Sequence, residues 1–428
     1  MNSDAKFGDY ARVESGFAFK SVDWDVSGVP VVKIKNVKDG TVSLEGCAFV
    51  SDLVASKAWA YRVSGGDVLV SLTGYVGQVG RVSIGDTVYV NQRVGLVQPI
   101  QPSDKSFVYH LLRNLRNEVK GLGTGSAQTN VAPKDIMNLP VPRMRSDYRR
   151  TVADILDCLE EKIATNRQVS KTLEDIAQTI FKSWFIDFDP VKAKMAGEKP
   201  VGMDTATAAL FPDAMEDSEL GLIPKGWVTE IADNIFDISI GRTPPRREPE
   251  WFCAGDEGVP WVSIRDMGTF STYSNLTNEG LTEEAVSKFR VPLVPEGTVL
   301  MSFKLTVGKL CISDKPLVTN EAIAHFVIHA DSVITNFFTY LWLANHDMNS
   351  LDSTSSIGIA TNSGVIKQIR FLMPSEVVVQ AFSEICSPIF NQIKNINSQS
   401  NSLVEIRDSL LPRLISGELQ IPEEMLAS

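Results

Sequence analysis

The chain has 428 residues, of which 43% are hydrophobic and 22% charged, and a formal net charge of −11. This composition is typical of an ordinary soluble protein with two or three domains. No apolar run reaches the roughly 18 residues of a transmembrane helix, and MNSDAKFGDYARVES at the N-terminus has no signal-peptide character. Five cysteines without a CxxC pair are typical of free thiols in a reducing compartment. We therefore expect a cytoplasmic protein.

The negative charge does not favour nucleic acid as a ligand at first sight, but it is unevenly distributed. Residues 1–143 hold 9 Lys and 7 Arg against 13 acidic residues, a net of +3, whereas residues 187–222 hold 3 Lys against 8 acidic residues, a net of −5. The charge of the whole chain is therefore a poor guide to what any one surface binds.

Residues 1–143 are expected to form a first β-rich domain. β-branched runs separated by Gly and Asp, which are typical of strands, occupy residues 29–37, 66–74, 77–84 and 87–100. A short helix is predicted over 107–122. The Gly-rich segment 121–133 that follows lacks GxxxxGK[ST], and Ser126 stands where GxGxxG would place its third glycine. We expect a surface loop there rather than a nucleotide site.

A long helix is predicted over residues 144–190. Between Asp147 and Phe188 there is neither Gly nor Pro, and apolar residues recur at steps of three and four: Leu156, Leu159, Ile163, Leu173, Ile176, Ile180 and Trp184. This is one apolar stripe on a helix of roughly 60 Å, which needs a partner helix. Ser146 can cap its start, and we expect its end where Pro190 restricts Asp189.

The chain repeats itself at an offset of 230 positions. Apolar positions match as Ile155 with Ile385, Leu159 with Ile389, Ile163 with Ile393, Leu173 with Leu403 and Ile176 with Ile406. The run 29–37 matches 259–267 at the same offset, and 66–72 matches 297–303 at 231. This period is too long for a solenoid, so we infer a tandem duplication. It predicts a second β-rich domain over 227–374 and a second helix over 375–428.

We expect an α+β protein in which two tandem β-rich domains are each followed by a long helix, the two helices packing as an antiparallel coiled coil. The expected seam joins Leu156, Leu159, Ile163, Leu173 and Ile180 to Ile389, Ile393, Ile396, Leu403 and Leu410. Because proline removes a backbone donor, we predict a kink or restart near Pro388 and a bend near Pro412. Residues 191–226, rich in Ala, Gly, Pro and acids, are expected to form a linker that adds nothing to a core.

No catalytic constellation is recognisable in the sequence. There is no Walker A motif, no GxSxG, no Asn-Pro-Pro-aromatic motif for amino-methyl transfer and no clustered His/Cys metal pattern. His325 and His329 lie in a predicted strand, where they share one face without converging on a metal. DFDPVKAK (187–194) faintly resembles a nuclease pattern, but a helix end with solvated charges explains it.

Two similar β-rich domains joined by antiparallel helices could measure distance along DNA. Each domain could read a short DNA segment, and the helices would set the separation, as protein geometry sets half-site spacing in dimeric DNA-binding proteins. Because the two copies are covalently joined they can diverge, so the DNA site need not be palindromic. The pseudo-twofold symmetry would also offer equivalent surfaces to two identical partners.

Three segments carry a resemblance to a known family. NRQVSKTLEDIAQTIFKSWFIDFDPV (166–191), LGLIPKGW (220–227) and IRDSLLPRLISGEL (406–419) resemble, in that order, the central conserved region, the lead-in to the second target recognition domain and the C-terminal conserved region of type I restriction-modification specificity subunits. The resemblance implies target recognition domains at 1–143 and 227–374, a central conserved helix at 144–190, a linker at 191–226 and a C-terminal conserved helix at 375–428.

The resemblance also implies a non-catalytic subunit that binds double-stranded DNA at a bipartite, asymmetric sequence. Its partners would be two methyltransferase (modification) subunits and two restriction (motor-nuclease) subunits. S-adenosylmethionine, ATP and Mg would then be bound by these partners and none by this chain. An assembly scaffold that binds the methyltransferase subunits without reading DNA is the alternative, which the overall acidity leaves open, and a stand-alone enzyme with an unrecognised site is a third reading.

The DNA-binding residues are expected in the loops that join the matched strands. Arg and Lys suit guanine, Asn and Gln suit adenine, Glu can accept from cytosine, and other arginines suit phosphates. The candidates in the first domain are Lys33, Lys35, Asn36, Thr73, Tyr75, Asn91, Gln92 and Arg93. The candidates in the second domain are Arg242, Arg246, Arg247, Arg265, Lys304, Thr306, Asn320 and Glu321. The alternatives are a merely solvated cation and, for Asn91, a turn cap.

An aromatic cluster at the end of the first helix is richer than one helix seam requires. It consists of Phe181, Trp184, Phe185 and Phe188. We expect part of it to dock the methyltransferase subunits. Packing beneath the second recognition domain is the alternative.

Overall fold

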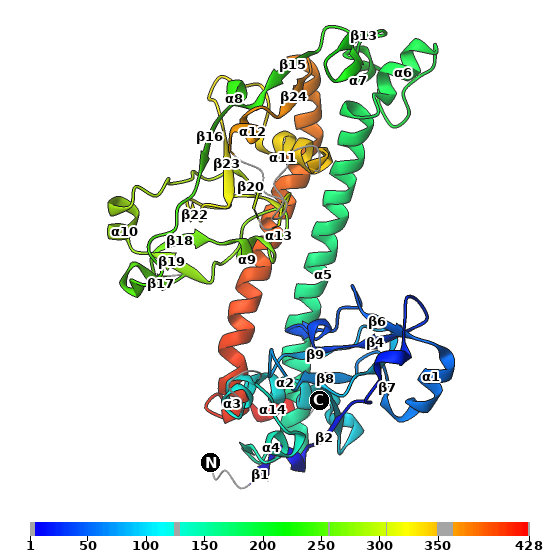
Figure 1. Ribbon diagram of the computed structural model, residues 1–428, viewed down its shortest axis with the longest axis vertical. Helices are drawn as coiled ribbons and strands as arrows, with labels where there is room; N and C mark the ends of the chain where they lie inside the picture. The colour runs from blue at the N-terminus through cyan, green and yellow to red at the C-terminus, as the bar shows by residue number, and fades with distance from the viewer. Residues whose placement is uncertain (1–4, 124–128, 256, 305, 349–362, 427–428) are drawn as a thin grey trace. The chain divides into compact units, whose positions relative to one another are not determined.

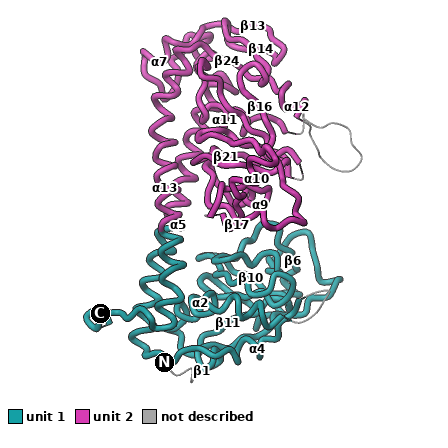
Figure 2. Tube along the Cα trace, turned by 90° about the vertical axis from the view of Figure 1, so that its left-hand side faces the viewer, with its two compact units in different colours: residues 1–163, 403–428 teal, residues 164–402 magenta. Residues whose placement is uncertain are grey.

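The computed structural model describes residues 5–123, 129–255, 257–304, 306–348 and 363–426. The chain divides into two compact units, which Figure 2 colours separately. Unit 1 comprises residues 1–163 and 403–428, and unit 2 comprises residues 164–402. Two long helices, α5 (Ser146–Phe185) and α13 (Glu376–Ser416), each contribute one end to either unit (Figure 1). The predicted α+β class is confirmed.

Unit 1 contains two five-stranded sheets, in the orders β2-β11-β8-β9-β5 and β3-β6-β4-β10-β7. Their strands are β2 (Ala11–Ser15), β3 (Trp24–Asp25), β4 (Val29–Val32), β5 (Gly40–Thr41), β6 (Ala48–Val50), β7 (Arg62–Ser64), β8 (Val68–Ser71), β9 (Val79–Arg81), β10 (Thr87–Val90) and β11 (Val94–Pro99). The other elements are the pair β1 (Ala5–Lys6) and β12 (Pro140–Val141), and the helices α1 (Asp52–Lys57), α2 (Lys105–Asn114), α3 (Arg116–Gly121), α4 (Pro133–Met137) and α14 (Glu423–Leu426). The helix predicted over 107–122 is therefore two helices.

Unit 2 contains two four-stranded sheets, in the orders β16-β23-β20-β21 and β17-β19-β18-β22. Their strands are β16 (Phe236–Ile240), β17 (Phe252–Ala254), β18 (Val259–Val262), β19 (Glu279–Leu281), β20 (Val299–Ser302), β21 (Leu310–Ile312), β22 (Val318–Thr319) and β23 (Ile323–Ile328). Two further strand pairs are β13 (Met215–Ser218) with β14 (Gly221–Pro224) and β15 (Val228–Ile231) with β24 (Arg370–Met373). The helices are α6 (Asp189–Met195), α7 (Thr205–Ala209), α8 (Ala232–Ile235), α9 (Ile264–Met267), α10 (Glu283–Lys288), α11 (Asn336–Asn345) and α12 (Ser363–Lys367).

The two units repeat one sheet topology. The order β2-β11-β8-β9 in unit 1 corresponds to β16-β23-β20-β21 in unit 2, and β6-β4-β10 corresponds to β19-β18-β22. The parallel pairs have matching registers, Val32 with Val90 and Val262 with Thr319. The duplication that the sequence offset predicts is therefore a duplication of fold.

The central strands are apolar on both faces because each lies between two cores. In β8, Val68 and Val70 belong to the core beneath α2, whereas Leu69 belongs to the core between the sheets. In β20, Val299 and Leu300 divide in the same way between two cores. Each such side chain contributes about 1.5 to 3 kcal/mol on burial. A strand buried on both faces has a continuous apolar sequence rather than an alternating one, as these two do.

Helices α5 and α13 run antiparallel where they meet. Within unit 2, Asn166 contacts Gln399, whereas Trp184 packs on Phe382, so rising numbers in α5 meet falling numbers in α13. Of the ten residues predicted for the seam, Leu156, Ile163, Ile393 and Ile396 are buried and the other six are partly buried. Ile176, which the periodicity placed in the stripe, is instead 44% exposed.

The helix ends and the linker depart from expectation. Helix α5 ends at Phe185, and Phe188 adopts a left-handed backbone conformation (φ 56°) before α6 begins at Asp189. Helix α13 is continuous through both prolines, so the predicted restart at Pro388 is wrong. Both prolines are exposed, so the carbonyl groups that they leave unbonded can face water. The predicted linker also contributes to the unit 2 core, through the buried side chains Val191, Phe211 and Ile223.

No helix in the described part of the chain is both long enough and apolar enough to cross a bilayer.

Candidate nucleic-acid interface

Two turns of unit 1, residues 72–78 between β8 and β9 and residues 91–93 between β10 and β11, form what we call the turn pair. The Leu72 backbone N–H donates to the Arg93 carbonyl at 3.0 Å, which joins the two turns directly. The Ser71 hydroxyl donates to the Tyr75 carbonyl and accepts from the Gln78 N–H at 2.9 Å. Gly77 has a φ of 81°, which glycine alone adopts at low cost. The backbone of the turn pair is thus held by hydrogen bonds at several points.

The turn pair brings together five of the predicted DNA-binding residues. Tyr75 is 75% exposed, Gln92 and Arg93 are exposed, and Thr73 and Asn91 are buried. The Thr73 hydroxyl donates to the Asn130 side-chain oxygen at 2.8 Å. An open, mostly polar pocket of about 480 Å³ lies against the turn pair, lined by Ser15, Leu72, Thr73, Gln92, Arg93, Asn130, Val131, Ala132 and Pro133. Ser15 and Asn130 are lining residues that the sequence reasoning missed.

Unit 2 contains a second turn pair, between β20 and β21 and at residues 320–322, with Leu305 outside the described residues. The Phe303 N–H donates to the Ala322 carbonyl at 3.0 Å, as Leu72 does to Arg93. The Ser302 hydroxyl donates to the Thr306 carbonyl and accepts from the Lys309 N–H at 3.0 Å. The two units therefore share the supporting bonds of the turn pair, although the outward side chains differ.

The two matched asparagines in the turn pairs are structural. The Asn91 side-chain oxygen accepts from the Arg93 N–H at 3.3 Å, and the Asn320 side-chain oxygen accepts from the Ala322 N–H at 3.1 Å. Their backbone N–H groups donate to Val32 and Val262, each at 3.0 Å. Each asparagine thus closes its own turn and ties it to the neighbouring strand, which is the turn-cap role considered above.

Asn36 also has a structural role rather than an outward position. It is 1% exposed, its side-chain oxygen accepts from the Lys33 N–H, and its amide nitrogen donates to the Ser43 and Glu45 carbonyls. Its match in unit 2, Asp266, is 2% exposed and accepts from Ser263 and Asn278. A buried amide with its bonding groups used inside the protein offers none to a base, so Asn36 is a correction to the predicted interface.

Immediately before Asn36 and Asp266, each unit has one exposed cation, and the two cations occupy matched positions. Lys35 follows Ile34 in unit 1 and Arg265 follows Ile264 in unit 2, and both side chains are exposed. Lys33 is half-buried instead, with Nζ 3.6 Å from the centre of the Trp24 ring. Burial, and then the charge of Lys35, lower the pKa of Lys33. Lys35 and Arg265 therefore remain the available cations of this loop.

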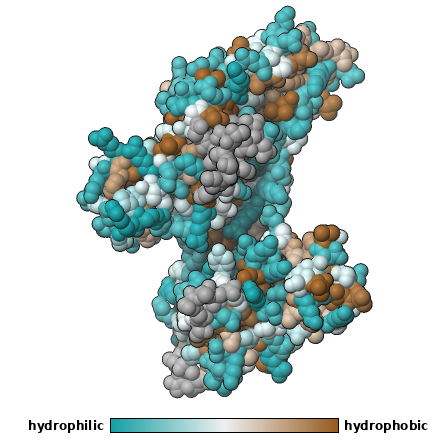
Figure 3. Space-filling model, viewed as in Figure 1, coloured by the Kyte–Doolittle hydropathy of each residue, from teal (hydrophilic) through white to brown (hydrophobic). Residues whose placement is uncertain are grey.

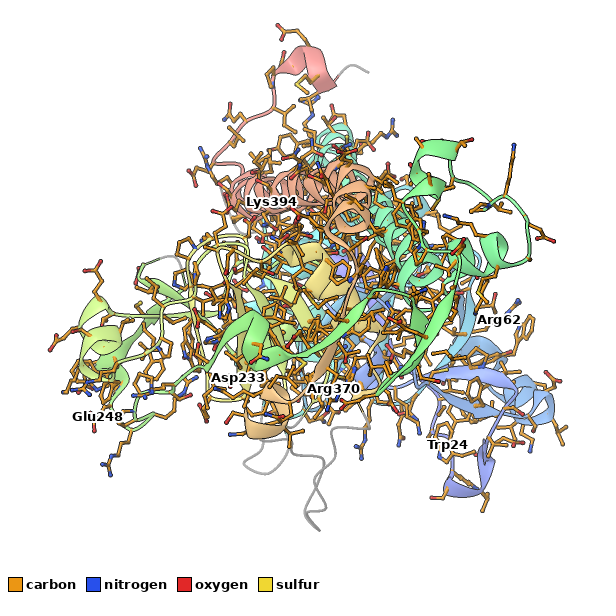
Figure 4. The ribbon with its side chains drawn as sticks, turned by 90° about the horizontal axis from the view of Figure 1, so that it is seen from above. Trp24, Arg62, Asp233, Glu248, Arg370 and Lys394 are labelled. Atoms are coloured by element: carbon orange, nitrogen blue, oxygen red, sulfur yellow. The ribbon has the colours of Figure 1, made fainter. Side chains whose placement is uncertain are left out.

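Exposed apolar side chains lie in the part of unit 1 that carries Trp24, α1 and β6. Trp24, labelled in Figure 4 with Arg62, lies in the outer sheet of the unit. Figure 3 shows hydrophobic side chains gathered over the lobe that carries α1 and β6. The exposed apolar side chains there include Val22, Val26, Leu53 and Trp59.

The three predicted arginines of unit 2 differ in what they contact. Arg246 pairs with both oxygens of Glu279, at 2.8 and 2.9 Å, and lies over the rings of Phe252 and Trp261. Arg242 donates to the Phe289 carbonyl at 3.1 Å. Arg247 is 87% exposed, and its Nε lies 3.7 Å from a Glu248 oxygen, farther than Arg246 lies from Glu279. Arg247 is thus the most available of the three for a phosphate.

Lys304 and Glu321 place opposite charges on the second turn pair. The Thr243 hydroxyl donates to Glu321. Burial opposes ionisation of Glu321, but that hydrogen bond and the charges of Lys304 and Arg246 together lower its pKa. The structure therefore brings Lys304, Arg246 and Glu321 into one electrostatic group, whereas the Gln92–Arg93 pair of unit 1 has no acidic member.

The family model described as "Type I restriction modification DNA specificity domain" matches residues 3–175 and again residues 224–405. These ranges hold both turn pairs. The chain belongs to the type I restriction-modification specificity family.

Two curated relatives and one solved structure illustrate the similarity. The chain is 28% identical over 325 residues to the HindI specificity subunit of Haemophilus influenzae, covering 66% of this chain and 69% of that one. It is 23% identical over 357 residues to the MjaIX specificity subunit of Methanocaldococcus jannaschii, covering 81% and 76%. The crystal structure of the type I S subunit from M. genitalium matches with a TM-score of 0.51 and 13% identity over 97% of both chains, and so supports the fold.

In this specificity-family chain, the aromatic cluster packs inside unit 2. Phe181, Trp184 and Phe185 are 0%, 6% and 1% exposed. Phe181 and Phe185 lie 5.2 and 5.1 Å from the ring of Phe338 on α11, and Phe185 lies 5.1 Å from that of Phe382 on α13. Partly buried Phe188 packs on the same core. The docking role predicted for this cluster is thus replaced by the alternative, packing beneath the second recognition domain.

The first recognition domain packs on α5 through a charged network, which we call the ionic floor. It consists of Asp157 and Glu160 of α5 with their partners Arg81, Ser106, Tyr109, His110 and Arg113. Asp157 accepts from Ser106, from His110 Nε2 at 2.8 Å and from Arg81 at 2.8 Å. Burial opposes its ionisation, but these partners lower the pKa of Asp157 to about 2. Glu160 pairs with Arg113 and accepts from the Tyr109 hydroxyl at 3.3 Å. This network could not be predicted from the sequence, because its members on α2 lie 47 to 51 positions from those on α5 and Arg81 lies farther away still.

The second recognition domain rests on an aromatic floor instead. The positions that match His110, Asp157 and Glu160 are Leu341, Ser387 and Phe390. The matched tyrosines are kept: Tyr340, like Tyr109, donates to a glutamate of α5, here Glu174 at 2.7 Å. Its floor is otherwise made by the rings of Phe181, Phe185, Phe337, Phe338, Phe382 and Phe390. The two floors thus differ in chemistry although the domains share a fold.

The ionic floor also has the geometry of a candidate metal site. Ligand atoms of His110, Asp157 and Glu160 lie within 4.8 Å of one another. Arg81 and Arg113, however, already pair with the two carboxylates. Because these guanidinium groups supply the positive charge, we assign the cluster to domain anchoring rather than to a metal.

Proposed function

We propose that the chain is the DNA-sequence-specificity subunit of a type I restriction-modification complex. Each recognition domain reads one half of a bipartite, asymmetric DNA site, and α5 and α13 set the spacing of the halves. The observation that carries this proposal is the duplicated turn pair: its supporting hydrogen bonds occur in both units, whereas Tyr75 and Arg93 in unit 1 correspond to Thr306 and Ala322 in unit 2. A constant frame with different outward side chains suits two different DNA sequences.

Two methyltransferase subunits are the proposed direct partners, with two restriction subunits in the full complex. The exposed apolar side chains Ile176 (44% exposed) and Ile406 (47% exposed) occupy matched positions on α5 and α13. Ile155 and Ile385 are a second matched pair, partly and 41% exposed respectively. Matched apolar positions on duplicated helices suit two copies of one partner, because each copy would meet the same surface. We therefore assign docking to these isoleucines in place of the aromatic cluster.

The catalytic chemistry belongs, in this proposal, to the partners. S-adenosylmethionine would be bound by the methyltransferase subunits, and ATP and Mg by the restriction subunits, all in the cytoplasm. This chain contributes the choice of DNA sequence and no reacting group.

The test is a selection from a random duplex library in which two variable segments flank a variable spacer. The full chain, alone and with its methyltransferase subunits, is incubated with the library and bound duplexes are sequenced. We expect a bipartite sequence with a fixed spacer, and loss of binding when either half is altered. Partner binding without any sequence preference would favour the assembly scaffold, and methyl transfer by the isolated chain would contradict the non-catalytic role.

A further inference from the structure

Three outward side chains of the first turn pair are not used by the protein itself. Tyr75, Gln92 and Arg93 are exposed, and within the described ranges none of the three side chains has a hydrogen-bond or ion-pair partner. Arg81 and Arg113, in contrast, are held by carboxylates. A surface arginine beside an unpartnered glutamine retains its full bonding capacity for a ligand.

The backbone beneath these side chains is held from several directions. Asn91 accepts from the Arg93 N–H, the Gln92 N–H donates to the Phe17 carbonyl at 2.9 Å, and the Arg93 carbonyl accepts from Leu72. Fixed backbone positions lower the entropy that an ordered contact costs. Gln92 and Arg93 also line the pocket of about 480 Å³, so their side chains border a hollow rather than a flat surface.

The second turn pair presents different groups at the same positions. Thr306 replaces Tyr75, Glu321 replaces Gln92, and Ala322, which is 5% exposed, replaces Arg93. The cation moves to Lys304, which replaces Thr73. The chemistry offered to a base edge therefore changes from an arginine fork with an amide to an ammonium with a carboxylate.

We propose that these matched positions determine the base sequence of each half-site: Tyr75, Gln92 and Arg93 in the first recognition domain, and Lys304, Thr306 and Glu321 in the second. Arg93 would contact a guanine through O6 and N7, with Gln92 on a neighbouring base, and Glu321 would accept from the amino group of a cytosine. This inference rests on the proposed function, that both domains read DNA. Asn36, Asn91, Asp266 and Asn320 hold the frame instead.

The test transfers the second pair of side chains to the first domain. The double variant Gln92→Glu, Arg93→Ala of the full chain, in complex with its methyltransferase subunits, is subjected to the duplex selection beside the wild type. We expect binding to the wild-type duplex to fall roughly tenfold or more, with a changed base preference at one or two adjacent positions of one half-site. The other half-site and the spacer should be unchanged, which shows that the variant is folded.

The control removes an arginine of the same domain outside the turn pair. Arg12 is an exposed arginine of β2, in the same sheet as β11, and Arg12→Ala should leave the selected sequence unchanged. A double variant that selects the wild-type half-site with affinity within twofold would overturn the inference while leaving the proposed function intact. A wild-type complex that selects no bipartite sequence would overturn the proposed function itself.

Discussion

The side-chain amide of Asn166 on α5 donates to the Gln399 side-chain oxygen on α13 at 2.9 Å, and it lies 3.3 Å from the Ser400 hydroxyl. Asn166 is 3% exposed, so a polar group occupies the seam between two helices that is otherwise largely apolar. A single buried polar residue in a helix pair favours one register at a cost in stability. This contact is the clearest register mark between α5 and α13.

Replacing Asn166 with leucine should loosen that register without unfolding the protein. Gln399 is exposed and Ser400 also donates to the Ile396 carbonyl, so neither needs Asn166, and we expect the free energy of unfolding to change by about 1 kcal/mol or less. Binding to duplexes with spacers one base pair longer or shorter should improve severalfold relative to the optimal spacer. Gln168→Leu, an exposed change on α5, is the control. Unaltered spacer discrimination in Asn166→Leu would argue against a register role.

Replacing Asp157 with asparagine should weaken the ionic floor. The pKa of Asp157 lies below its ordinary value, so its stabilisation is complete above about pH 4 and is lost as the pH falls toward about 2. At neutral pH we expect a loss of about 2 kcal/mol, because Arg81 and His110 lose a charged acceptor. This loss of stability is measured as faster amide hydrogen exchange in α2. Asp154→Asn, an exposed change on the same helix, should have little effect, and equal protection of α2 in both variants would contradict the assignment.

His325 should make unit 2 sensitive to mild acid. Its ring lies between the Ser239 and Thr319 hydroxyls, at 2.9 and 2.7 Å, and burial lowers the pKa of His325 to about 4. Since the unfolded chain binds a proton near pH 6.5 and the folded chain only near 4, stability should fall by up to about 3 kcal/mol as the pH falls through that window. His325→Gln keeps a polar side chain but does not titrate. Denaturation between pH 7 and 4 should therefore show a shallower slope for the variant, and parallel slopes would refute the effect.

Substitutions in the aromatic cluster should affect the folding of unit 2, whereas substitutions of the matched isoleucines should affect partner binding. Trp184→Ala removes a buried ring that packs on Phe211 and Phe382, so we expect unit 2 to lose about 3 to 5 kcal/mol. Ile176→Asp with Ile406→Asp changes exposed positions and should alter stability by only about 0.5 kcal/mol, yet weaken binding of the methyltransferase subunits at least roughly tenfold. Pull-down and denaturation are measured together. Thr172→Asp is the control, and full partner binding by the isoleucine double variant would exclude this surface.

The repeat and the two helices could be predicted because periodic patterns depend on neighbours in sequence. The strand runs and the stripe of α5 needed only local residues and one constant offset. The packing of Trp184 and Phe185 could not be predicted in this way. An aromatic residue that docks a partner and one that fills a core can have the same neighbours in the sequence. Their cover is α11 and Phe382, about 150 to 200 residues away. Asn36 was misplaced for the same reason, because its bonds depend on how residues 43–45 fold back.

Pro388 and Pro412 show a second limit on what the sequence alone can predict. Proline inside a helix predicts a break, yet both prolines and the residues four positions before them, Glu384 and Asp408, are exposed. A carbonyl group that loses its N–H donor on the solvent-exposed side of a helix can accept a hydrogen bond from water instead. The cost of proline therefore depends on which face it occupies, and a one-dimensional pattern that ignores the partner surface overestimates that cost.

The contrast between ionic and aromatic floors constrains how this gene can change by recombination between its own halves. An exchange of the turn-pair segments would place new outward side chains on a backbone whose hydrogen bonds both halves already make. An exchange that included α2 and α11 would set Leu341 against Asp157 and His110 against Ser387, so that Asp157 and His110 would each lose the hydrogen bond that joins them. We therefore expect gene conversion that preserves both folded domains to be confined to tracts that stop short of these helices.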